Sequence, residues 1–422
     1  MNHRFITALF CLGLICLLDA CTLAPEYIRP DAPVPPEWPK GRAYNADEQQ
    51  KDTPFGGTLR WEEFFTDDNL RKLIAMALAN NRDLRIAALN VELSRALYGI
   101  QRDALYPSVY ATGSASKTRA SGELTEPGQT RTSERYSLSL GSIAWEIDFF
   151  GRIRSLKDKA LEEYLASEHA RSSAQILLVS TVADAYLALA ADRENLALAE
   201  NTLQTQKATF AMVQRQFDLG IANDLSLRQA QTQVETARRA VAGYTQQAAR
   251  DENALTILLG GTPAPRELLP SDLGSISPPK YISAGTSSEV LLGRPDVLQA
   301  EAALRAVNAE IGAARAAFFP RITLTTTYGT ASEELGSLFN SHTGTWSYAP
   351  QITMPIFDAR TWSALKATKV QREIAVTQYE KTVQNAFRDV ADALAVRGTV
   401  NEQLAAQQAL VETDERVRLA GD

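Results

Sequence analysis

Cysteine and histidine are scarce in this sequence, and their scarcity limits the chemistry that the chain can support. The 422 residues include three cysteines and three histidines. Cys11 and Cys16 lie in an apolar N-terminal stretch that we expect to be cleaved, so no disulfide or cysteine-based metal site can form within one mature chain. His3, His169 and His342 are far apart, and no catalytic-triad, metal-spacing or phosphate-loop motif accompanies them. The sequence therefore predicts that the chain is not an enzyme and holds no metal ion or dissociable cofactor.

Positive charge in excess and long apolar runs are also missing. The formal net charge is -7 and no basic patch occurs, which argues against binding to nucleic acid. The one uniformly apolar stretch, residues 5–18, is about 14 residues long, shorter than the ~20 that a membrane-spanning helix needs. With Arg4 ahead of it and small residues behind, this stretch is typical of a signal peptide. The chain is therefore not expected to cross a membrane through several helices.

The signal peptide ends in a pattern typical of bacterial lipoproteins. Residues 18–21 read Leu-Asp-Ala-Cys, with an apolar residue three positions before the cysteine and a small one directly before it. We expect Cys21 to carry the N-acyl and S-diacylglycerol lipid, because a lone exposed thiol is a liability in an oxidising compartment. The alternative is an ordinary secretory peptide that leaves Cys21 as a free thiol. Thr22, rather than aspartate, follows Cys21 and favours the outer membrane.

A sustained heptad pattern dominates the middle of the chain. Apolar residues recur every seven positions along residues 152–260, outward to a turn at 219–221 and then back. The outgoing positions are Val182, Leu189, Leu196, Leu203, Phe210 and Phe217, and the returning ones are Leu227, Val234, Val241, Ala248 and Leu255, with Ala230, Ala237, Tyr244, Asp251 and Leu258 three positions on. Neither proline nor glycine interrupts residues 152–219, which would span roughly 100 Å as a helix. We predict an antiparallel helical hairpin that suits a tube or a stalk.

Two aspartates interrupt the apolar seams of this hairpin. Asp192 and Asp251 occupy equivalent registers on the two arms, so we expect them at the same height, roughly 44 Å from the tip by the helical rise. An unpaired buried carboxylate is costly. Either the aspartates pair with the adjacent Arg193 and Arg250, or they form an acidic ring inside a tunnel and favour cations.

Charged residues also cluster at the turn of the hairpin. Arg215, Asp218, Gly220, Asp224 and Arg228 surround it. They could be helix caps and surface ion pairs. The alternative, which the family resemblance given at the end of this section implies, is a periplasmic mouth where a partner docks and a gate closes.

Four segments show the period-two alternation of strands. They lie at about residues 107–118, 136–148, 320–330 and 345–357, and the second contains a slip at Gly141. The alternative to membrane strands is a soluble hairpin packed on one face. Because the smallest membrane barrels have about eight strands and an open sheet cannot sit in lipid, several chains would have to share one barrel. Three chains would supply twelve strands.

The chain also contains an internal duplication. An offset of 213 residues aligns Asp83 with Asp296 and Pro107 with Pro320, and an offset of 208 aligns residues 182–185 with 390–393. The second copy ends before its return helix, which leaves it about fifty residues shorter than a full duplication. We expect a signal peptide at 1–20, an extended strap at 21–65, a first repeat at 66–262, a linker at 263–288 and a second repeat at 289–422.

Several local motifs resemble those of TolC-like outer-membrane factors, in the lipoprotein branch that serves proton-driven multidrug efflux pumps. They lie at residues 145–151, 215–220, 227–230, 253–255, 294–296 and 311–320, of which the last, IGAARAAFFP, is the most specific. The resemblance implies a homotrimer in the outer membrane of a Gram-negative cell, with a twelve-stranded β-barrel and a periplasmic α-barrel built from long helical hairpins. It also implies a periplasmic adaptor and an inner-membrane pump as partners, and passive transport of drugs and other small molecules. The alternatives are an exit duct for type I protein secretion and a structural coiled-coil lipoprotein without a pore.

Overall fold

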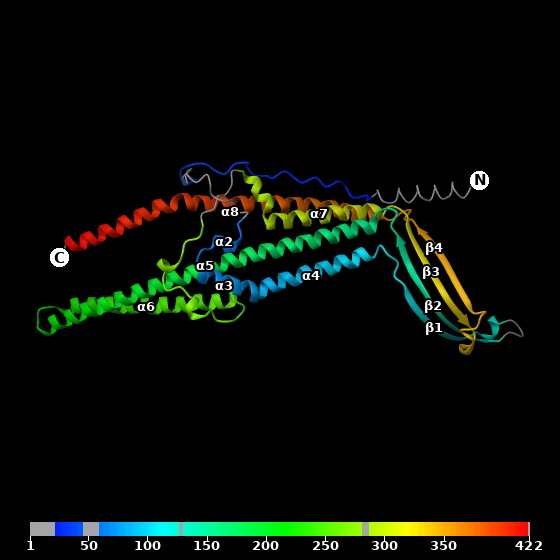
Figure 1. Cartoon of the computed structure of the whole chain (residues 1–422), viewed down its shortest axis with the longest axis horizontal. Helices are drawn as coiled ribbons and strands as arrows, with labels where there is room; N and C mark the ends of the chain where they lie inside the picture. Colours follow the sequence, from blue (N-terminus) through cyan, green and yellow to red (C-terminus); the bar gives the residue numbers. More distant parts are fainter. Residues whose placement is uncertain (1–21, 45–58, 126–129, 281–286, 421–422) are drawn as a thin grey trace. The chain divides into compact units, whose positions relative to one another are not determined.

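The structure is a computed structural model that describes residues 22–44, 59–125, 130–280 and 287–420, so Cys21 lies outside the described residues. Long helices and one four-stranded sheet make up most of it (Figure 1). The α-helices are α2 (Trp61–Phe64), α3 (Asp68–Asn80), α4 (Arg82–Asp103), α5 (Arg152–Asp218), α6 (Asp224–Leu258), α7 (Pro295–Ala316) and α8 (Ala359–Ala420). The strands are β1 (Tyr110–Arg119), β2 (Thr132–Ile147), β3 (Arg321–Ser332) and β4 (Gly344–Thr353). Short 3-10 turns are η1 (Arg42–Tyr44), η3 (Gly122–Leu124), η4 (Arg266–Leu268), η5 (Leu273–Ser275), η6 (Ser288–Gly293) and η7 (Leu335–Ser337).

Side-chain caps separate the first helices. The carboxylate of Asp67 accepts a hydrogen bond from the backbone N–H of Leu70 at 2.8 Å and caps α3. Asn81 ends α3 and accepts from the N–H of Leu84 at 3.0 Å in the first turn of α4. α4 stops at Asp103 and gives way to turns before Pro107.

The predicted helical hairpin is confirmed by α5 and α6. α5 runs for 67 residues and α6 for 35. Gly220 has a φ of 74°, the left-handed conformation that glycine adopts without strain, and it lets the chain reverse. The side chain of Asn223 then caps α6 by accepting from the N–H of Ser226 at 2.9 Å.

A third helix completes the core where the hairpin is best packed. Leu73 and Ile74 of α3, Val182 of α5 and Leu255 of α6 are fully buried together. By length and composition, α5 is the one helix in the described part of the chain that could cross a membrane, yet its residues 178–186 contribute to this core. Towards the tip the seam positions are less well covered, since Phe217 and Tyr244 are about one-third exposed. Between two helices alone, part of each seam side chain stays exposed to solvent, whereas a third helix covers it.

The sheet has the order β1-β2-β3-β4 with every neighbouring pair antiparallel. The register between β2 and β3 shifts between Ser142 and Trp145, where Ala144 takes a φ of 51°. The slip predicted at Gly141 therefore lies slightly later in the strand. The predicted extension of the fourth strand to residue 357 was also wrong, because β4 ends at Thr353, two residues before Pro355, which has no N–H to donate.

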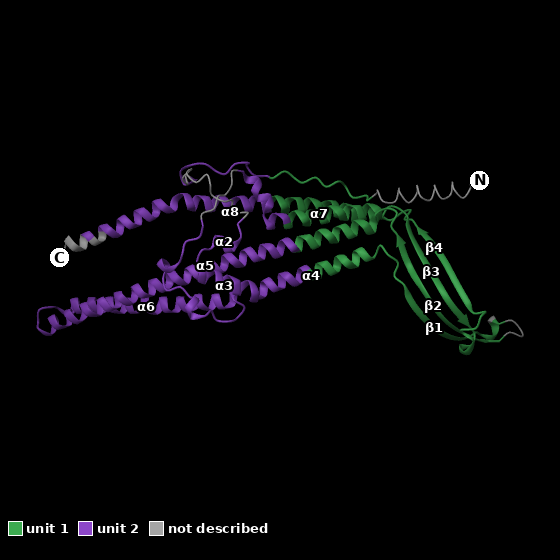
Figure 2. Ribbon diagram, viewed as in Figure 1, with its two compact units in different colours: residues 1–32, 92–167, 299–381 green, residues 33–91, 168–298, 382–422 purple. Residues whose placement is uncertain are grey.

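The element order occurs twice, as the duplication requires. α4, β1, β2 and α5 correspond to α7, β3, β4 and α8, and the paired helices have similar lengths: 22 residues for both α4 and α7, and 67 and 62 for α5 and α8. The chain also divides into two compact units that cut across the repeats (Figure 2). Unit 1 holds the sheet with residues 1–32, 92–167 and 299–381, and unit 2 holds residues 33–91, 168–298 and 382–422.

Candidate channel surfaces and hairpin tip

The sheet presents apolar and polar cross-strand rows in alternation. Leu140, Tyr328 and Trp346 are paired across β2, β3 and β4, and their exposed fractions are 57%, 75% and 77%. The next row, Ser139, Gly329 and Thr345, is small and polar. Because successive side chains in a strand point to opposite faces, one face of the sheet is apolar and the other polar. This is the pattern of a strand that has lipid on one side and water on the other.

The bulge in β2 keeps this pattern intact along the strand. Beyond the register shift, Ile147 pairs with Ile322, and Ile322 with Ile352, which forms a second apolar row. The following row, Glu146, Thr323 and Gln351, is polar. One extra residue in β2 changes the parity of the strand, so Ile147 joins the apolar face although its position differs from that of Leu140 by an odd number.

An ion-pair cluster fixes the end of the sheet that adjoins the helices. Arg152, the first residue of α5, binds the Glu146 carboxylate twice, with Nε–Oε1 at 2.8 Å and a terminal nitrogen 2.7 Å from Oε2. Arg321, the first residue of β3, lies 2.6 Å from the same carboxylate. Asp148 accepts from the backbone N–H of Arg154 at 2.8 Å in the first turn of α5. The motif at 145–151 is recognisable in the sequence, but Arg321 joins it from the second repeat, and no local pattern predicts that.

At the hairpin tip the predicted charged residues form local contacts. Asp218 accepts from the side-chain amide of Gln214 at 2.9 Å, and Arg228 lies 3.4 Å from Asp224 in the first turn of α6. Arg228 and Asp224 are each about two-thirds exposed, so this ion pair contributes little to stability. Asp218 and Asp224 thus make surface contacts within their own helices, while Arg215 contributes its carbonyl to the N–H of Leu219 at 3.1 Å.

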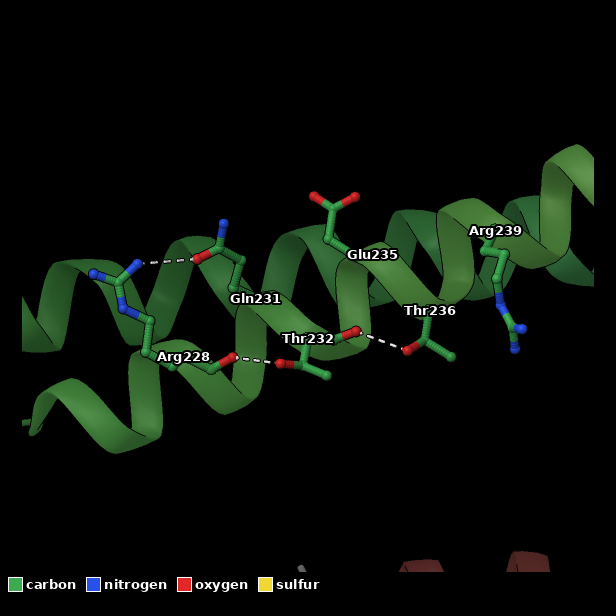
Figure 3. A pocket seen from close by; sticks show the side chains of 6 residues that line it. All are labelled: Arg228, Gln231, Thr232, Glu235, Thr236 and Arg239. Atoms are coloured by element: carbon green, nitrogen blue, oxygen red, sulfur yellow. Dashed lines mark hydrogen bonds between the residues drawn. The ribbon is translucent and has the colours of Figure 1, made fainter.

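A shallow polar depression begins at Arg228 and follows one face of α6 away from the tip (Figure 3). Arg228 donates to the side chain of Gln231 at 3.3 Å. The hydroxyls of Thr232 and Thr236 donate to backbone carbonyls of α6 itself, so they are already hydrogen-bonded within the helix. The depression is lined by Arg228, Gln231, Thr232, Glu235, Thr236 and Arg239.

The aspartates of the two arms meet as the hairpin register predicts. The side chains of Asp192 and Asp251 lie within hydrogen-bonding range of each other, and Gln247 donates to Oδ1 of Asp251 at 3.0 Å. Pairing of Asp192 with Arg193 was the wrong alternative, because Arg193 binds Glu252 at 2.7 Å and the carbonyl of Pro270 at 2.6 Å.

The meeting of two carboxyl groups changes the acidity of one of them. Oδ2 of Asp251 is buried and receives no hydrogen bond from the described residues, so a proton held between the two carboxyl groups is the donor that would satisfy it. Burial, the hydrogen bond with Asp192 and the charge of Asp192 raise the pKa of Asp251. That the pair faces a tunnel remains a prediction.

A buried carboxylate in α7 holds the start of the strap, and sequence reasoning missed it. Glu301 is 2% exposed and accepts two hydrogen bonds from Arg29, at 2.9 and 2.7 Å, and one from Arg305 at 2.7 Å. The hydroxyl of Tyr27 donates to it at 3.2 Å, and the Tyr27 ring lies under the Arg305 guanidinium at 5.0 Å. Burial alone would raise the pKa of Glu301, but the hydrogen bonds and charges of the two arginines outweigh it and hold the pKa below its ordinary value.

The backbone of the strap continues along α7 in the same unit. The side chains of Asn308 and Arg315 donate to the carbonyls of Pro25 and Leu23 at 2.8 and 3.0 Å. At Gly312 a Cβ atom would lie 2.7 Å from the backbone nitrogen of Ala24, so glycine is required for this close approach. The composition of the strap predicted an extended connector but not this docking.

Comparison with known proteins agrees with the fold and the amphipathic sheet. The family model of the outer membrane efflux protein matches residues 73–261 and 286–420. The antibiotic efflux pump outer membrane protein ArpC of Pseudomonas putida is 45% identical over 405 residues, which are 94% of this chain and 82% of ArpC. The cation efflux system protein CusC of Escherichia coli K12 is 40% identical over 406 residues, 94% of this chain and 85% of CusC.

A solved channel structure has a similar fold. The open state of the MtrE outer membrane channel of Neisseria gonorrhoeae superposes with a TM-score of 0.81 at 35% identity, and the match covers 95% of this chain and 88% of MtrE. The chain therefore belongs to the outer membrane efflux protein family, and it is an outer-membrane channel component of an efflux pump.

Proposed function

We propose that the chain is a passive conduit that receives drugs and other small molecules from a periplasmic adaptor and a proton-driven inner-membrane pump and releases them outside the cell. The observation that carries this proposal is the sheet, whose apolar rows suit lipid and whose polar rows suit a water-filled interior. Reconstitution of the purified protein in planar bilayers tests it. We expect stable ion-conducting channels, and bilayers that stay non-conducting with correctly inserted protein would contradict it.

The conduit is proposed to be a homotrimer. β1 and β4 are the edges of the sheet, and unpaired backbone groups at such edges are not tolerated in lipid. If β1 pairs with β4 of the next copy, α4, which precedes β1, lies beside α8 of that copy, which follows β4. α4 carries an exposed apolar stripe at the required spacing, with exposed fractions of 50–64% at Ile86, Leu89, Leu93, Leu97 and Ile100.

The α4 stripe offers a direct test of the assembly. Leu93→Glu places a charge in the middle of the stripe, whereas Arg95→Glu changes the charge at an exposed position on the other side of the same helix. We expect Leu93→Glu to shift the mass of the detergent-solubilised particle from three copies towards one, and Arg95→Glu to leave it unchanged. Equal behaviour of the two variants would contradict the role of this stripe.

Among the possible cargoes we favour organic molecules over metal cations. ArpC is described as part of an antibiotic efflux pump, and CusC, which is less similar, as part of a cation efflux system. Expression together with the matching pump and adaptor, in cells that lack their own channel, should raise resistance to antibiotics. Increased resistance to toxic metal cations alone would favour cation export instead.

We propose that Arg228 and the depression on α6 form part of the adaptor-docking surface at the tip, together with Arg215, Asp218, Gly220 and Asp224. The supporting observation is this face of α6, where the threonine hydroxyls are hydrogen-bonded within the helix and the charged side chains stay exposed. Arg228→Ala should weaken binding of the adaptor. Arg250→Ala is the matched control, because Arg250 is exposed on α6 and does not line the depression.

We further propose that Cys21 carries the lipid anchor. The strap directly after it is docked on α7, which would keep the anchor at a fixed distance from the sheet. Mass spectrometry of the mature N-terminal peptide should find an acylated cysteine, and an unmodified thiol there would refute the proposal. Because the sheet also inserts in the membrane, Cys21→Ser should weaken localisation without abolishing transport.

A further inference from the structure

The second half of the strap, residues 35–44, lies on α8. The indole of Trp38 stacks on the ring of Phe387, with ring centroids 5.2 Å apart and an interplanar angle of 24°. Arg42 lies 3.1 Å from Glu402, fifteen residues further along α8, a separation of roughly 22 Å by the helical rise. Both strap residues and both helix residues belong to unit 2, where the strap follows α8 in Figure 2.

Next to Arg42 the strap crosses α8 in direct backbone contact. A Cβ atom at Gly398 would lie 2.2 Å from the carbonyl oxygen of Ala43, a distance that no side chain can occupy. Glycine inside a helix is destabilising relative to alanine. The close crossing gives a reason for glycine at this position. By contrast, a Cβ atom at Gly243, a helical glycine in α6, would meet nothing within 4 Å.

The strap is also held on its other side, by η6. The hydroxyl of Ser288 donates to the carbonyl of Pro35 at 2.6 Å, and its backbone N–H donates to the carbonyl of Pro36 at 2.9 Å. Ser288 is 6% exposed, so these bonds are shielded from water. The strap is thus attached to η6 at one end and to α8 at the other. Beyond Glu402, residues 403–413 of α8 are exposed.

We propose that residues 35–44 act as a clasp on α8, which restrains this helix and favours a narrow state of the channel. A channel that has an open state, as MtrE does, also has states that are less open. Widening a tunnel made of long helices requires them to bend or shift. A strap that grips α8 near Phe387 and Glu402 makes its contacts in one position of the helix, so it shifts the population towards that position.

The clasp rests on the proposed function, and Gly398→Ala tests it. The added methyl group displaces the strap at the crossing, while alanine is the better helix former, so α8 itself is not weakened. Gly243→Ala makes the same chemical change in α6, where the space is open. Trp38→Ala is a second way to release the strap, since it removes the stack on Phe387 without changing α8.

Two measurements on the full-length reconstituted protein test the clasp. Hydrogen exchange over residues 35–44 reports whether the strap is released, and planar-bilayer recordings report the fraction of time spent at high conductance. We expect Gly398→Ala and Trp38→Ala to accelerate exchange in the strap and to raise the high-conductance fraction several-fold, and Gly243→Ala to change neither.

Different experimental outcomes would contradict the clasp proposal and the conduit proposal. Wild-type conductance in a variant whose strap exchanges rapidly would refute the clasp and leave the conduit intact. Unchanged strap exchange in Gly398→Ala would contradict the crossing itself. If the wild-type protein forms no channels at all, the proposed function fails rather than the clasp alone.

Discussion

The carboxylate of Glu301 offers the most direct test of how the strap is held on α7. Glu301→Gln keeps the size of the side chain but removes its charge, and the two guanidinium groups of Arg29 and Arg305 lose their shared partner. Removing one partner of a buried ion pair costs ~3–5 kcal/mol. The side chains of Arg29 and Arg305 are 43% and 39% exposed, so water replaces part of the lost interaction. We therefore expect Glu301→Gln to lower the free energy of unfolding by about 2–3 kcal/mol.

Chemical denaturation of the purified protein measures this loss as a shift of the transition midpoint, and hydrogen exchange over residues 23–31 locates it. Glu310→Gln is the matched control on the same helix, because Glu310 is 30% exposed and makes an ion pair with Lys159 at 3.0 Å. Loss of this ion pair should lower the free energy of unfolding by less than about 1 kcal/mol. Equal destabilisation by the two variants, or unchanged exchange in the strap of Glu301→Gln, would refute the assignment of Glu301 as the anchor.

The same carboxylate makes the strap sensitive to acid. The pKa of Glu301 is lower in the folded protein than in an unfolded chain, where it is about 4.3. Its contribution to stability is therefore fully present above that unfolded value and is lost as the pH falls through the folded value. Exchange in residues 23–31 should accelerate in acid, below about pH 4. In Glu301→Gln, exchange corrected for its intrinsic pH dependence should stay constant across this range.

Three further predictions follow from the hairpin and the sheet. Replacing Asp192 and Asp251 together by asparagine should lower the ratio of cation to anion permeability in planar bilayers, and unchanged selectivity would exclude an acidic ring. Because the folded pKa of Asp251 is raised, the pair should stabilise the hairpin progressively as the pH falls through that raised pKa, and the double variant should lose this dependence. Tyr328→Arg should cost about 2–4 kcal/mol if its row lies near the bilayer midplane, whereas Thr327→Arg on the polar face should cost much less in a folding titration in lipid. Leu255→Ala, at a fully buried position, should cost about 2–5 kcal/mol in denaturation, while Ile257→Ala, 72% exposed, should stay within about 0.5 kcal/mol.

Periodic features of the fold could be predicted from the sequence. The seven-residue repeat predicted α5 and α6, and the absence of proline and glycine predicted the length of α5. The alternation in the four strands was also predicted correctly, although strand ends differed by several residues. These features depend on the conformational preferences of neighbouring residues and on which face of an element is apolar, and both can be read along the chain.

Contacts between distant segments were decided by the tertiary structure alone. Arg193 has an acidic neighbour at Asp192, yet it binds Glu252 on the other arm of the hairpin. Glu301 looks in sequence like a surface residue of a helix, but the strap, some 272 residues away, buries it. Gly398 looks like a weak point in α8 until the carbonyl of Ala43 is seen against it. The sequence by itself determined the helices, the strands and the apolar faces, because each follows from local periodicity. Which charge meets which, and where one backbone needs a glycine to approach another, depends on segments that only folding brings together.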